Sequence, residues 1–190
     1  AVVGLPKNGK MPEILSNYSD DKYTNVGSLK ETDFEAVESL NPDLIIIGGR
    51  QAEDIDSFKE IAPTVNLAVD GQDYMNSFKT VVTDLGNLFD KQDEAKKAID
   101  EIEAKIAKVN KTVTEKGLTA SVVMANEGSI SAFSAKSRYG LIYNGLGFTE
   151  VDKNIDDSTH VQQVSFEYFL ENKSDYVFVV DRGAITGKGD

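Results

Sequence analysis

The sequence has little of the chemistry on which most enzymes and metal proteins depend, since it has no cysteine and one histidine, His160. Without cysteine the chain has no disulfide, no thiolate nucleophile and no cysteine-ligated metal site. One histidine is too few for a structural zinc site, and no catalytic-triad motif surrounds it. There is also no run of 18 apolar residues that would cross a membrane as a helix. These absences favour binding over covalent or metal-dependent catalysis.

The charge balance is strongly acidic, with a net charge of −12 and a pI near 4.5. Nucleic acids and anionic lipids need a basic surface, so both are disfavoured as partners. The 190 residues are 40 % hydrophobic, enough for one large domain or two small lobes. The chain starts with the apolar run Ala1-Val2-Val3-Gly4 and not with Met, which is typical of an excised fragment.

Residues 73–116 have apolar side chains every three or four positions, which predicts helix. Gly86 weakens the helical pattern, and Gln92 or Asp93 can cap a second helix that runs to Lys116. That second helix, free of Gly and Pro, would be about 36 Å long at about 1.5 Å per residue. A rod of this length spans a small domain.

The segments on either side of these helices alternate between strand and helix patterns. Residues 43–49 and 175–180 are continuous apolar strands of the kind buried on both faces of a parallel sheet. Further strands are expected at 1–5, 64–69, 120–126 and 129–133, and helices at 33–40, 54–62, 139–146 and 165–172. The fold class is therefore α/β with mainly parallel sheets, divided into an N-terminal lobe (1–72), linking helices (73–116) and a C-terminal lobe (117–190).

One stretch recurs in both lobes at a constant offset of 132 residues. Residues 33–50 and 165–182 each read as a cap, a short helix, an Asp, an apolar strand and an Arg. A supersecondary unit used once per lobe accounts for this match, although chance remains an alternative over 18 residues.

Arginine is the scarce cation: 17 lysines accompany three arginines, Arg50, Arg138 and Arg182. Two of them follow the repeated strands, where open α/β sheets place ligands, and Arg138 precedes a helix. Arginine grips carboxylates and other oxygen-rich anions with a planar fork that lysine lacks. The alternative is that each arginine pairs with a surface carboxylate. Glycine-rich phosphate loops do not compete with this interpretation, since Gly145-Leu146-Gly147 lacks the third glycine of a dinucleotide motif.

Four motifs together resemble the ferric-siderophore-binding lipoproteins of bacterial ABC importers, especially the catecholate-binding branch of Gram-positive bacteria. They are residues 27–35, residues 40–50, Ser137-Arg138-Tyr139-Gly140 and Val180-Asp181-Arg182-Gly183. The resemblance covers essentially the whole chain. It implies a two-lobed protein of the class III periplasmic-binding-protein type, with one long helix between the lobes and the ligand in the cleft. It also implies that this chain is incomplete at both ends, because such proteins start earlier, at a lipidated cysteine, and continue further.

The resemblance assigns roles to individual residues. Arg50, Arg138 and Arg182 are the expected ligand-binding arginines, and Lys7 and Tyr139 are further expected ligand contacts. His160 stands where such proteins place an iron-ligating histidine, although a lone loop histidine is often merely solvated. Glu35 and Glu167, at matching places in the two repeats, are the expected contacts to the permease. Their alternative role is to stabilise helix N-termini through the dipole.

The function that these observations favour is capture of a ferric siderophore outside the cytoplasm and delivery to an ABC permease, without catalytic turnover. The protein is expected to be a monomer tethered as a lipoprotein, with no permanent cofactor and with the siderophore as transported ligand. A haem or cobalamin carrier of the same fold is the alternative among binding proteins. An α/β enzyme acting on a small anionic substrate is the alternative from another class, and the lack of an acid/base constellation argues against it.

Overall fold

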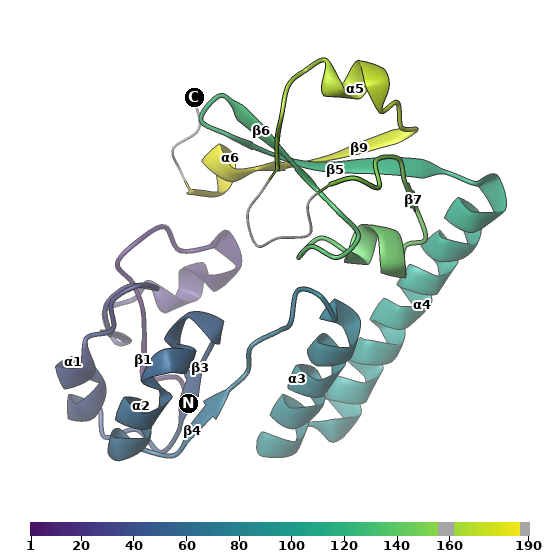
Figure 1. Ribbon diagram of the computed structural model, residues 1–190. Coiled ribbons are helices and arrows are strands. Elements are labelled where there is room, and N and C mark those ends of the chain that lie inside the picture. The colour runs from purple at the N-terminus through teal and green to yellow at the C-terminus, as the bar shows by residue number, and fades with distance from the viewer. Residues whose placement is uncertain (156–161, 187–190) are drawn as a thin grey trace. The chain divides into compact units, whose positions relative to one another are not determined.

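The computed structural model describes residues 1–155 and 162–186 and divides the chain into two compact units, Ala1–Ala68 and Val69–Asp190. The long helices therefore belong to the second unit (Figure 1). Among the described residues, no helix is both long and apolar enough to cross a membrane.

The first unit consists of two separate pairs of parallel strands with short helices between them (Figure 1). β1 pairs with β2, and β3 pairs with β4. In chain order the elements are β1 (Gly4–Leu5), a 3-10 helix (Glu13–Tyr18), β2 (Thr24–Asn25), α1 (Phe34–Ser39), β3 (Ile45–Ile47), a 3-10 helix (Gly49–Asp54), α2 (Ile55–Ile61) and β4 (Thr64–Asn66). The small core of this unit is formed by Val37, Ile45, Ile47, Phe58 and Ala62.

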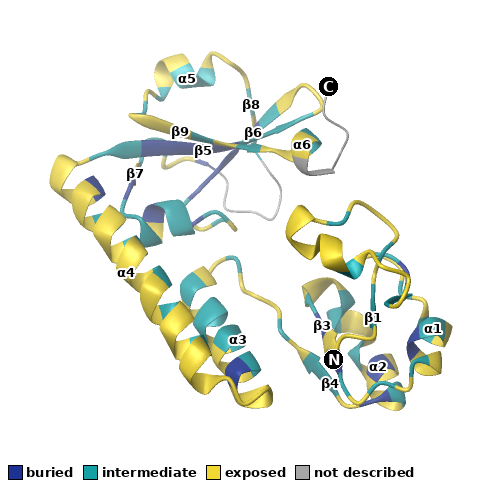
Figure 2. Ribbon diagram, turned by 180° about the vertical axis from the view of Figure 1, so that it is seen from behind, coloured by how far each residue is buried: buried dark blue, intermediate teal, exposed yellow. Residues whose placement is uncertain are grey.

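The second unit begins with two helices, α3 (Tyr74–Leu88) and α4 (Gln92–Lys116), as the apolar spacing predicts. α4 has 25 residues and ends at Gly117, whose φ of 61° gives the left-handed C-cap that favours glycine. Figure 2 shows that α4 is exposed along much of its length.

Gly86 does not end α3, which continues through it to Leu88. Gly86 is buried, and a Cβ at this position would lie 2.7 Å from the Cβ of Ala95 on α4. The glycine therefore allows the two helices to approach closely. The expected cap is wrong: Lys91 is the N-cap residue of α4 and makes no side-chain cap bond, while Asp93 and Glu94 lie in the first turn.

A five-stranded mixed sheet follows α4 (Figure 1). β5 pairs with β9 along one edge, and with β7 and then β6 along the other edge. The pairings of β5 with β7 and β9 are parallel. The pairings of β6 with β5 and β8 are antiparallel. The hairpin turn uses Glu127 (φ 49°) and Gly128 (φ 75°). The remaining elements are β5 (Thr119–Asn126), β6 (Ser129–Phe133), a π-helical turn (Leu141–Gly145), β7 (Thr149–Glu150), β8 (Gln162–Val164), α5 (Tyr168–Glu171), β9 (Tyr176–Asp181) and α6 (Arg182–Thr186).

Both faces of this sheet carry a core. On one face Val113 of α4 packs in a cluster with Val122, Phe133 and Tyr143. On the other, Val123 and Ala132 pack with Ile155, next to the half-buried Phe169. β5, which is covered on both faces, therefore has no exposed residue (Figure 2).

Two strands expected to be buried on both faces are not. Ile46 of β3 is 48 % exposed, and Val179 of β9 is 60 % exposed. The α/β class is confirmed, but these two strands each have an uncovered apolar face in this chain.

The repeated unit is present in both halves with one difference at its cap. In the first copy the Asp33 carboxylate accepts a hydrogen bond from the Ala36 amide at 2.9 Å. In the second, Glu167 and not Ser165 occupies the N-cap position of α5, so the expected cap there is wrong. Asp175 of the second copy accepts bonds from the amide and hydroxyl of Thr119, at 2.9 and 2.8 Å, and so ties β9 to β5.

Candidate functional site

Arg138 and Tyr139 lie in a tight turn that follows β6. The turn is closed by two backbone bonds: the Ser137 amide donates to Ser134 O at 3.1 Å, and the Gly140 amide donates to Ser137 O at 2.9 Å. The Ser137 hydroxyl also accepts from the Tyr139 amide at 3.2 Å. The backbone that carries Arg138 is thereby held in one conformation.

Two more distant residues anchor this turn. The Glu150 carboxylate on β7 accepts a bond from the Ala135 amide at 2.9 Å, and the Asn144 side chain donates to Ala135 O at 2.8 Å. Gly140 is required by space, because a Cβ there would overlap the Ala135 carbonyl oxygen. The turn is thus fixed to the sheet and to the π-helical segment that follows it.

The guanidinium of Arg138 lies over two aromatic rings. Its central carbon is 5.7 Å from the ring centroid of Phe133 and 5.9 Å from that of Tyr139. The two rings meet edge to face, with centroids 4.7 Å apart and planes at 84°. Such contacts orient an arginine for about 0.5 to 1 kcal/mol at an exposed site and leave its N–H groups available. Arg138 is exposed and has no carboxylate partner within 4.0 Å in the part of the chain that the structure describes.

The loop that precedes α3 packs against the backbone of Arg138. A Cβ at Gly71 would lie 3.0 Å from both the Cα and the Cβ of Arg138. The loop is held by Ser77, whose hydroxyl accepts a bond from the Asp70 amide at 2.9 Å. A larger residue at position 71 would therefore displace the arginine.

Arg182 is the first residue of α6, directly after β9, so the expected position past the carboxyl end of a strand is confirmed. The Asp181 carboxylate accepts a bond from the Ala184 amide at 2.9 Å and fixes the start of this short helix. The residue Arg182 itself is exposed.

Arg50 belongs to the first unit and is also exposed just past the end of a strand, β3. Next to it, the Gln51 side chain donates to Leu29 O at 2.9 Å, and the Gln51 amide donates to Gly48 O at 3.1 Å. These bonds hold the 3-10 turn that presents Arg50.

Lys7 has a structural contact. Its ammonium donates to the backbone oxygens of Ser19 and Asp20, at 3.2 and 2.7 Å, at the end of the first 3-10 helix. A lysine has three donor positions, so a ligand contact would use the third.

Glu35 and Glu167 are both exposed at the start of short helices, as expected. A hydrogen bond from the Ser165 side chain lowers the pKa of the Glu167 carboxyl below its ordinary value. This carboxylate is therefore charged over the whole neutral range.

His160 lies outside the described residues. Across residues 1–155 and 162–186, no three His, Cys, Asp or Glu side chains gather as a metal site.

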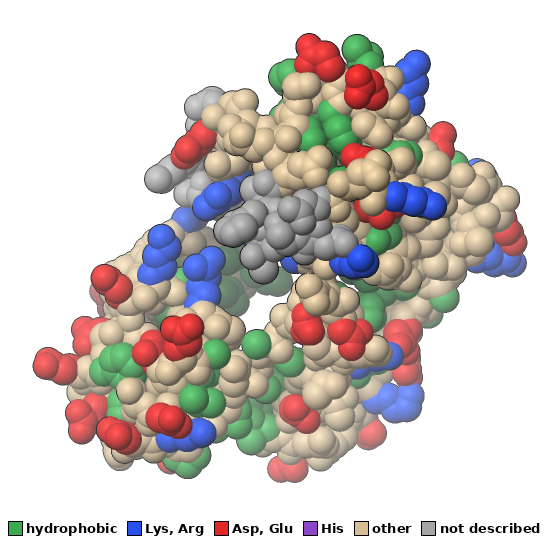
Figure 3. Space-filling model, viewed as in Figure 1, with side chains coloured by type: hydrophobic (Ala, Val, Ile, Leu, Met, Phe, Trp, Pro, Cys, Tyr) green, Lys and Arg blue, Asp and Glu red, His purple; other side chains and the backbone are tan. Residues whose placement is uncertain are grey.

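The charged side chains follow a simple division. Lysines, not arginines, form the ion pairs along the two long helices, as in Lys79–Glu103 at 2.9 Å and Lys91–Glu94 at 2.7 Å. In Figure 3 acidic side chains are scattered over the visible surface of each unit. Arg138, in contrast, lies against the aromatic rings of Phe133 and Tyr139.

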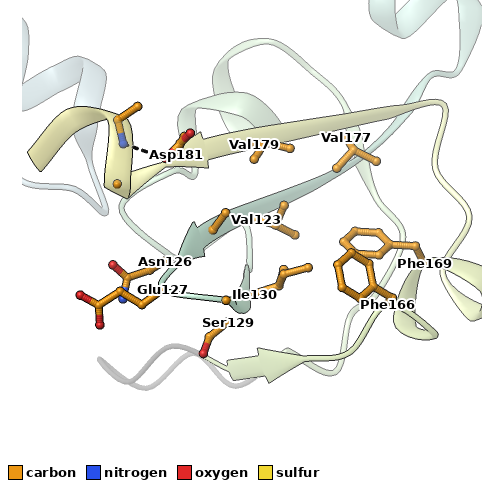
Figure 4. Close-up of a pocket in the computed structure, with 14 residues that line it drawn as sticks. Val123, Asn126, Glu127, Ser129, Ile130, Phe166, Phe169, Val177, Val179 and Asp181 are labelled. Carbon is orange, nitrogen blue, oxygen red and sulfur yellow. Dashed lines mark hydrogen bonds between the residues drawn. The ribbon is translucent and has the colours of Figure 1, made fainter. Parts of the chain in front are cut away.

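A hollow of about 670 Å³ lies on the sheet face of the second unit and is a different feature (Figure 4). Its lining is mainly apolar, with Val123, Val177, Val179, Phe166 and Phe169 around it, and it includes none of the three arginines. It is an uncovered sheet face and not a polar ligand site.

Sequence reasoning missed the residues that support Arg138. Phe133 ends a strand, Glu150 lies 12 residues after Arg138, and Gly71 precedes the long helices. No local motif links these positions to residue 138, since only the fold brings them together.

Residues 4–190 match the family described as "Periplasmic binding protein". The petrobactin-binding protein YclQ of Bacillus subtilis is 49 % identical over 187 residues, which are 98 % of this chain and 59 % of YclQ. The probable siderophore-binding lipoprotein YfiY of B. subtilis is 29 % identical over 183 residues, covering 94 % of this chain and 52 % of YfiY.

Two solved structures share the fold. The crystal structure of YclQ superposes with a TM-score of 0.90, covering 98 % of this chain and 65 % of YclQ. The catecholate-siderophore binding protein VctP of Vibrio cholerae is 32 % identical and superposes with a TM-score of 0.92, covering 98 % of this chain and 67 % of VctP. The chain thus spans about three fifths of the length of YclQ and matches it along nearly all of its own length. The fold expected from the resemblance is confirmed, and the chain belongs to the periplasmic binding protein family.

Proposed function

We propose that this chain binds a ferric siderophore of the catecholate type outside the cytoplasm and passes it to the membrane subunits of an ABC importer. Two relatives support this proposal by name, one a petrobactin-binding protein and one a catecholate-siderophore binding protein. The family is one of binding proteins, so the enzyme alternative is set aside.

The observation that carries the proposal is the exposed guanidinium of Arg138 over Phe133 and Tyr139. A ferric catecholate combines negative charge with flat aromatic rings, so one cluster of a cation and aromatic rings complements both properties. A charge pair at about 4 Å contributes about 4 kcal/mol at an effective dielectric constant near 20, before desolvation is subtracted. In a chain with a net charge of −12, a cation at the site offsets the general repulsion of an anion.

The other expected ligand residues complete the proposal. Arg50 and Arg182 are exposed cations past strand ends and serve as further anion contacts. Lys7 supplies its remaining donor, and Tyr139 contributes the edge of its ring. His160 would complete the coordination of iron in siderophores that leave coordination positions open.

Delivery to the importer requires a surface that the permease recognises. Glu35 and Glu167 are exposed carboxylates on comparable helices of the two units, and they serve as the contacts to basic residues of the membrane subunits. A lipid anchor outside this chain would hold the protein at the membrane surface, as the name of the relative YfiY indicates for that protein. The protein acts as a monomer and carries no permanent cofactor, since the ferric siderophore is its cargo.

Fluorescence quenching tests the proposal. The chain has seven tyrosines and no tryptophan, so binding of an iron complex can be followed through tyrosine emission. The titrants are a ferric catecholate, the same catecholate without iron, a ferric hydroxamate and haem. We expect saturable quenching at the lowest concentration for the ferric catecholate. Tighter binding of haem or of the hydroxamate would instead assign the site to that ligand.

A further inference from the structure

The chain contains two Asn-Gly pairs, Asn8-Gly9 and Asn144-Gly145, and the structure places them in opposite environments. In such a pair the backbone nitrogen of the glycine can attack the side-chain carbonyl carbon of the asparagine, because the attack closes a five-membered ring. Glycine allows this approach best, since it has no Cβ and the freest backbone. The reaction needs an unobstructed amide nitrogen, a polarised side-chain carbonyl and a backbone that can turn.

Asn8-Gly9 lies in the loop that follows β1, and both residues are exposed. Gly9 has a φ of 142°, and no atom lies within 4 Å of the position that a Cβ would occupy. Across residues 1–155 and 162–186, the Gly9 amide donates no hydrogen bond. The attacking nitrogen is therefore neither crowded nor held by a partner.

The side chain of Asn25 polarises the carbonyl that would be attacked. Its Nδ2 donates to Oδ1 of Asn8 at 2.7 Å. Its own Oδ1 accepts from the amides of Lys7 and Gly27, both at 3.0 Å, and this pair of bonds directs the nitrogen toward Asn8. A fixed donor on a carbonyl oxygen stabilises the negative charge that develops there when a nucleophile adds to the carbon.

Asn144-Gly145 has the same two residues in a rigid setting, the π-helical turn Leu141–Gly145. The Asn144 side chain donates to Ala135 O at 2.8 Å, and Gly145 O accepts from the Asn110 side chain at 2.9 Å. A Cβ at Gly145 would lie 2.6 Å from Cδ1 of Leu141, so this glycine is closely packed. Ring closure would require the backbone to leave its helical conformation, which these contacts oppose.

We propose that Asn8 is a site of spontaneous covalent modification, for which the fold supplies both the nucleophile and the activating donor. The Gly9 nitrogen bonds to Cγ of Asn8, the bond from Cγ to Nδ2 breaks, and the Gly9 amide proton passes through solvent to the departing nitrogen, which leaves as ammonia. The product is a succinimide. Water then opens the ring, at Cγ to give an aspartyl residue or at the backbone carbonyl to give an isoaspartyl residue. No group is oxidised or reduced.

Both products carry a new negative charge beside Lys7, and the isoaspartyl form also has an extra backbone carbon at the bridge between Asn8 and Ser28. Lys7 is an anion contact in the proposed function. The modified chain, separated by ion exchange, should therefore bind a ferric catecholate about threefold more weakly, a consequence that rests on that function. Equal affinity of the two forms would remove this consequence and the ligand role of Lys7, whereas the modification itself is measured by mass.

Incubation of the 190-residue chain in mildly alkaline buffer, followed by proteolysis and mass spectrometry, tests the site. Each modified peptide gains about 1 Da, and a methyltransferase specific for isoaspartyl residues labels the isoaspartyl form. In the folded chain we expect Asn8 to react at least about tenfold faster than Asn144, because only Asn144 is held by the fold. In urea, where neither pair is structured, the two rates should agree within about threefold.

Asn25→Asp tests the activating donor. The new side chain keeps an oxygen for the amides of Lys7 and Gly27 but has no N–H for Asn8. It should slow modification of Asn8 by about threefold or more in the folded chain and leave the rate in urea nearly unchanged. The matched control is Asn66→Asp, which adds the same charge at another exposed position of the first unit and should leave both rates unchanged.

Two results would overturn the inference. Reaction of Asn144 as fast as Asn8 in the folded chain would show that the fold does not select the site. An unchanged rate in Asn25→Asp would show that the Asn25 side chain does not activate the carbonyl.

Discussion

The guanidinium carbon of Arg138 lies 5.7 Å from the ring centroid of Phe133, the last residue of β6. Because Phe133 is only 5 % exposed, its ring is a fixed part of the core, and it positions a cation that is otherwise free of carboxylate partners in the described chain. The first prediction follows from this contact.

Arg138→Ala should weaken binding of a ferric catecholate by more than about tenfold, because it removes a charge contact worth more than about 1.4 kcal/mol. Arg138→Lys should restore only part of the affinity, because a lysine ammonium cannot bind an oxyanion through two parallel N–H groups and stacks less well on aromatic rings. Titration by fluorescence quenching measures both. The matched control is Lys97→Ala on α4, an exposed lysine that should change affinity by less than about twofold. Unchanged affinity of Arg138→Ala would refute the role of this arginine.

Gly86→Ala should destabilise the second unit although alanine is the better helix former by about 1 kcal/mol. The added methyl group would lie 2.7 Å from Ala95, so α3 and α4 would have to separate. Overpacking of this kind typically costs about 1 to 3 kcal/mol. The free energy of unfolding in urea measures the change.

Asn87→Ala is the control for this prediction, because the neighbouring residue is exposed on the same helix. It should be neutral or slightly stabilising. If Gly86→Ala were the more stable variant, glycine would merely weaken the helix, as the sequence alone suggests.

The helices around Gly86 show which features of the fold can be predicted from the sequence and which cannot. Apolar periodicity correctly predicts α3 and α4 within one or two residues at each end, since that pattern is local. The purpose of the glycine depends on Ala95, which packs against it only after the chain has reversed direction. Close approach between two helices has no signature in either helix.

The same limit applies to the candidate site. The scarcity of arginine singles out Arg50, Arg138 and Arg182, and the position after an apolar strand further marks Arg50 and Arg182. The Phe133 ring, the Glu150 anchor and the close contact at Gly71 come from three separate segments, so only the folded structure joins them. The exposure of Ile46 and Val179 was not predictable either. An apolar run predicts that both faces of a strand are buried, but it does not identify the segment that packs on each face.

Tyr143 should make stability depend on alkaline pH. Its hydroxyl accepts from the Val122 amide at 3.1 Å and donates to Phe133 O at 3.3 Å, and burial raises its pKa from 10.0 to about 12. Because the folded pKa is the higher one, this stabilisation is complete below pH 10 and is lost as pH rises toward about 12. A shift of this size corresponds to about 2 to 3 kcal/mol.

The measurement for this prediction is the free energy of unfolding between about pH 9 and about pH 12. Tyr143→Phe should lower stability at neutral pH by about 1 to 2 kcal/mol through the lost hydrogen bonds, and its alkaline decline should be shallower. Tyr74→Phe, at an exposed position on α3, should follow the unchanged protein at every pH. Parallel curves for Tyr143→Phe and the unchanged protein would contradict the prediction.

Val179→Lys should slow aggregation of the chain on mild heating. β9 pairs only with β5 among the described strands, and its exposed face carries Val177 and Val179, at 47 and 60 % exposure. An apolar strand with an open edge is a template for pairing with other chains, and a charge on it blocks that pairing. Light scattering measures the rate. Val109→Lys, at an exposed apolar position on α4, is the control and should leave the rate nearly unchanged.

Glu35→Ala and Glu167→Ala should leave siderophore affinity within about twofold but reduce uptake through the importer, with the double variant the most impaired. Both carboxylates are exposed at the start of short helices, where loss of the helix-dipole interaction costs only about 0.3 to 1 kcal/mol. That loss is too small to abolish transport by unfolding. The controls are Glu38→Ala and Glu171→Ala, which remove an exposed carboxylate from the same two helices and should transport normally. Uptake of the iron-loaded siderophore by cells with the importer separates the alternatives: normal transport by the double variant would leave these residues only their role at the helix N-termini.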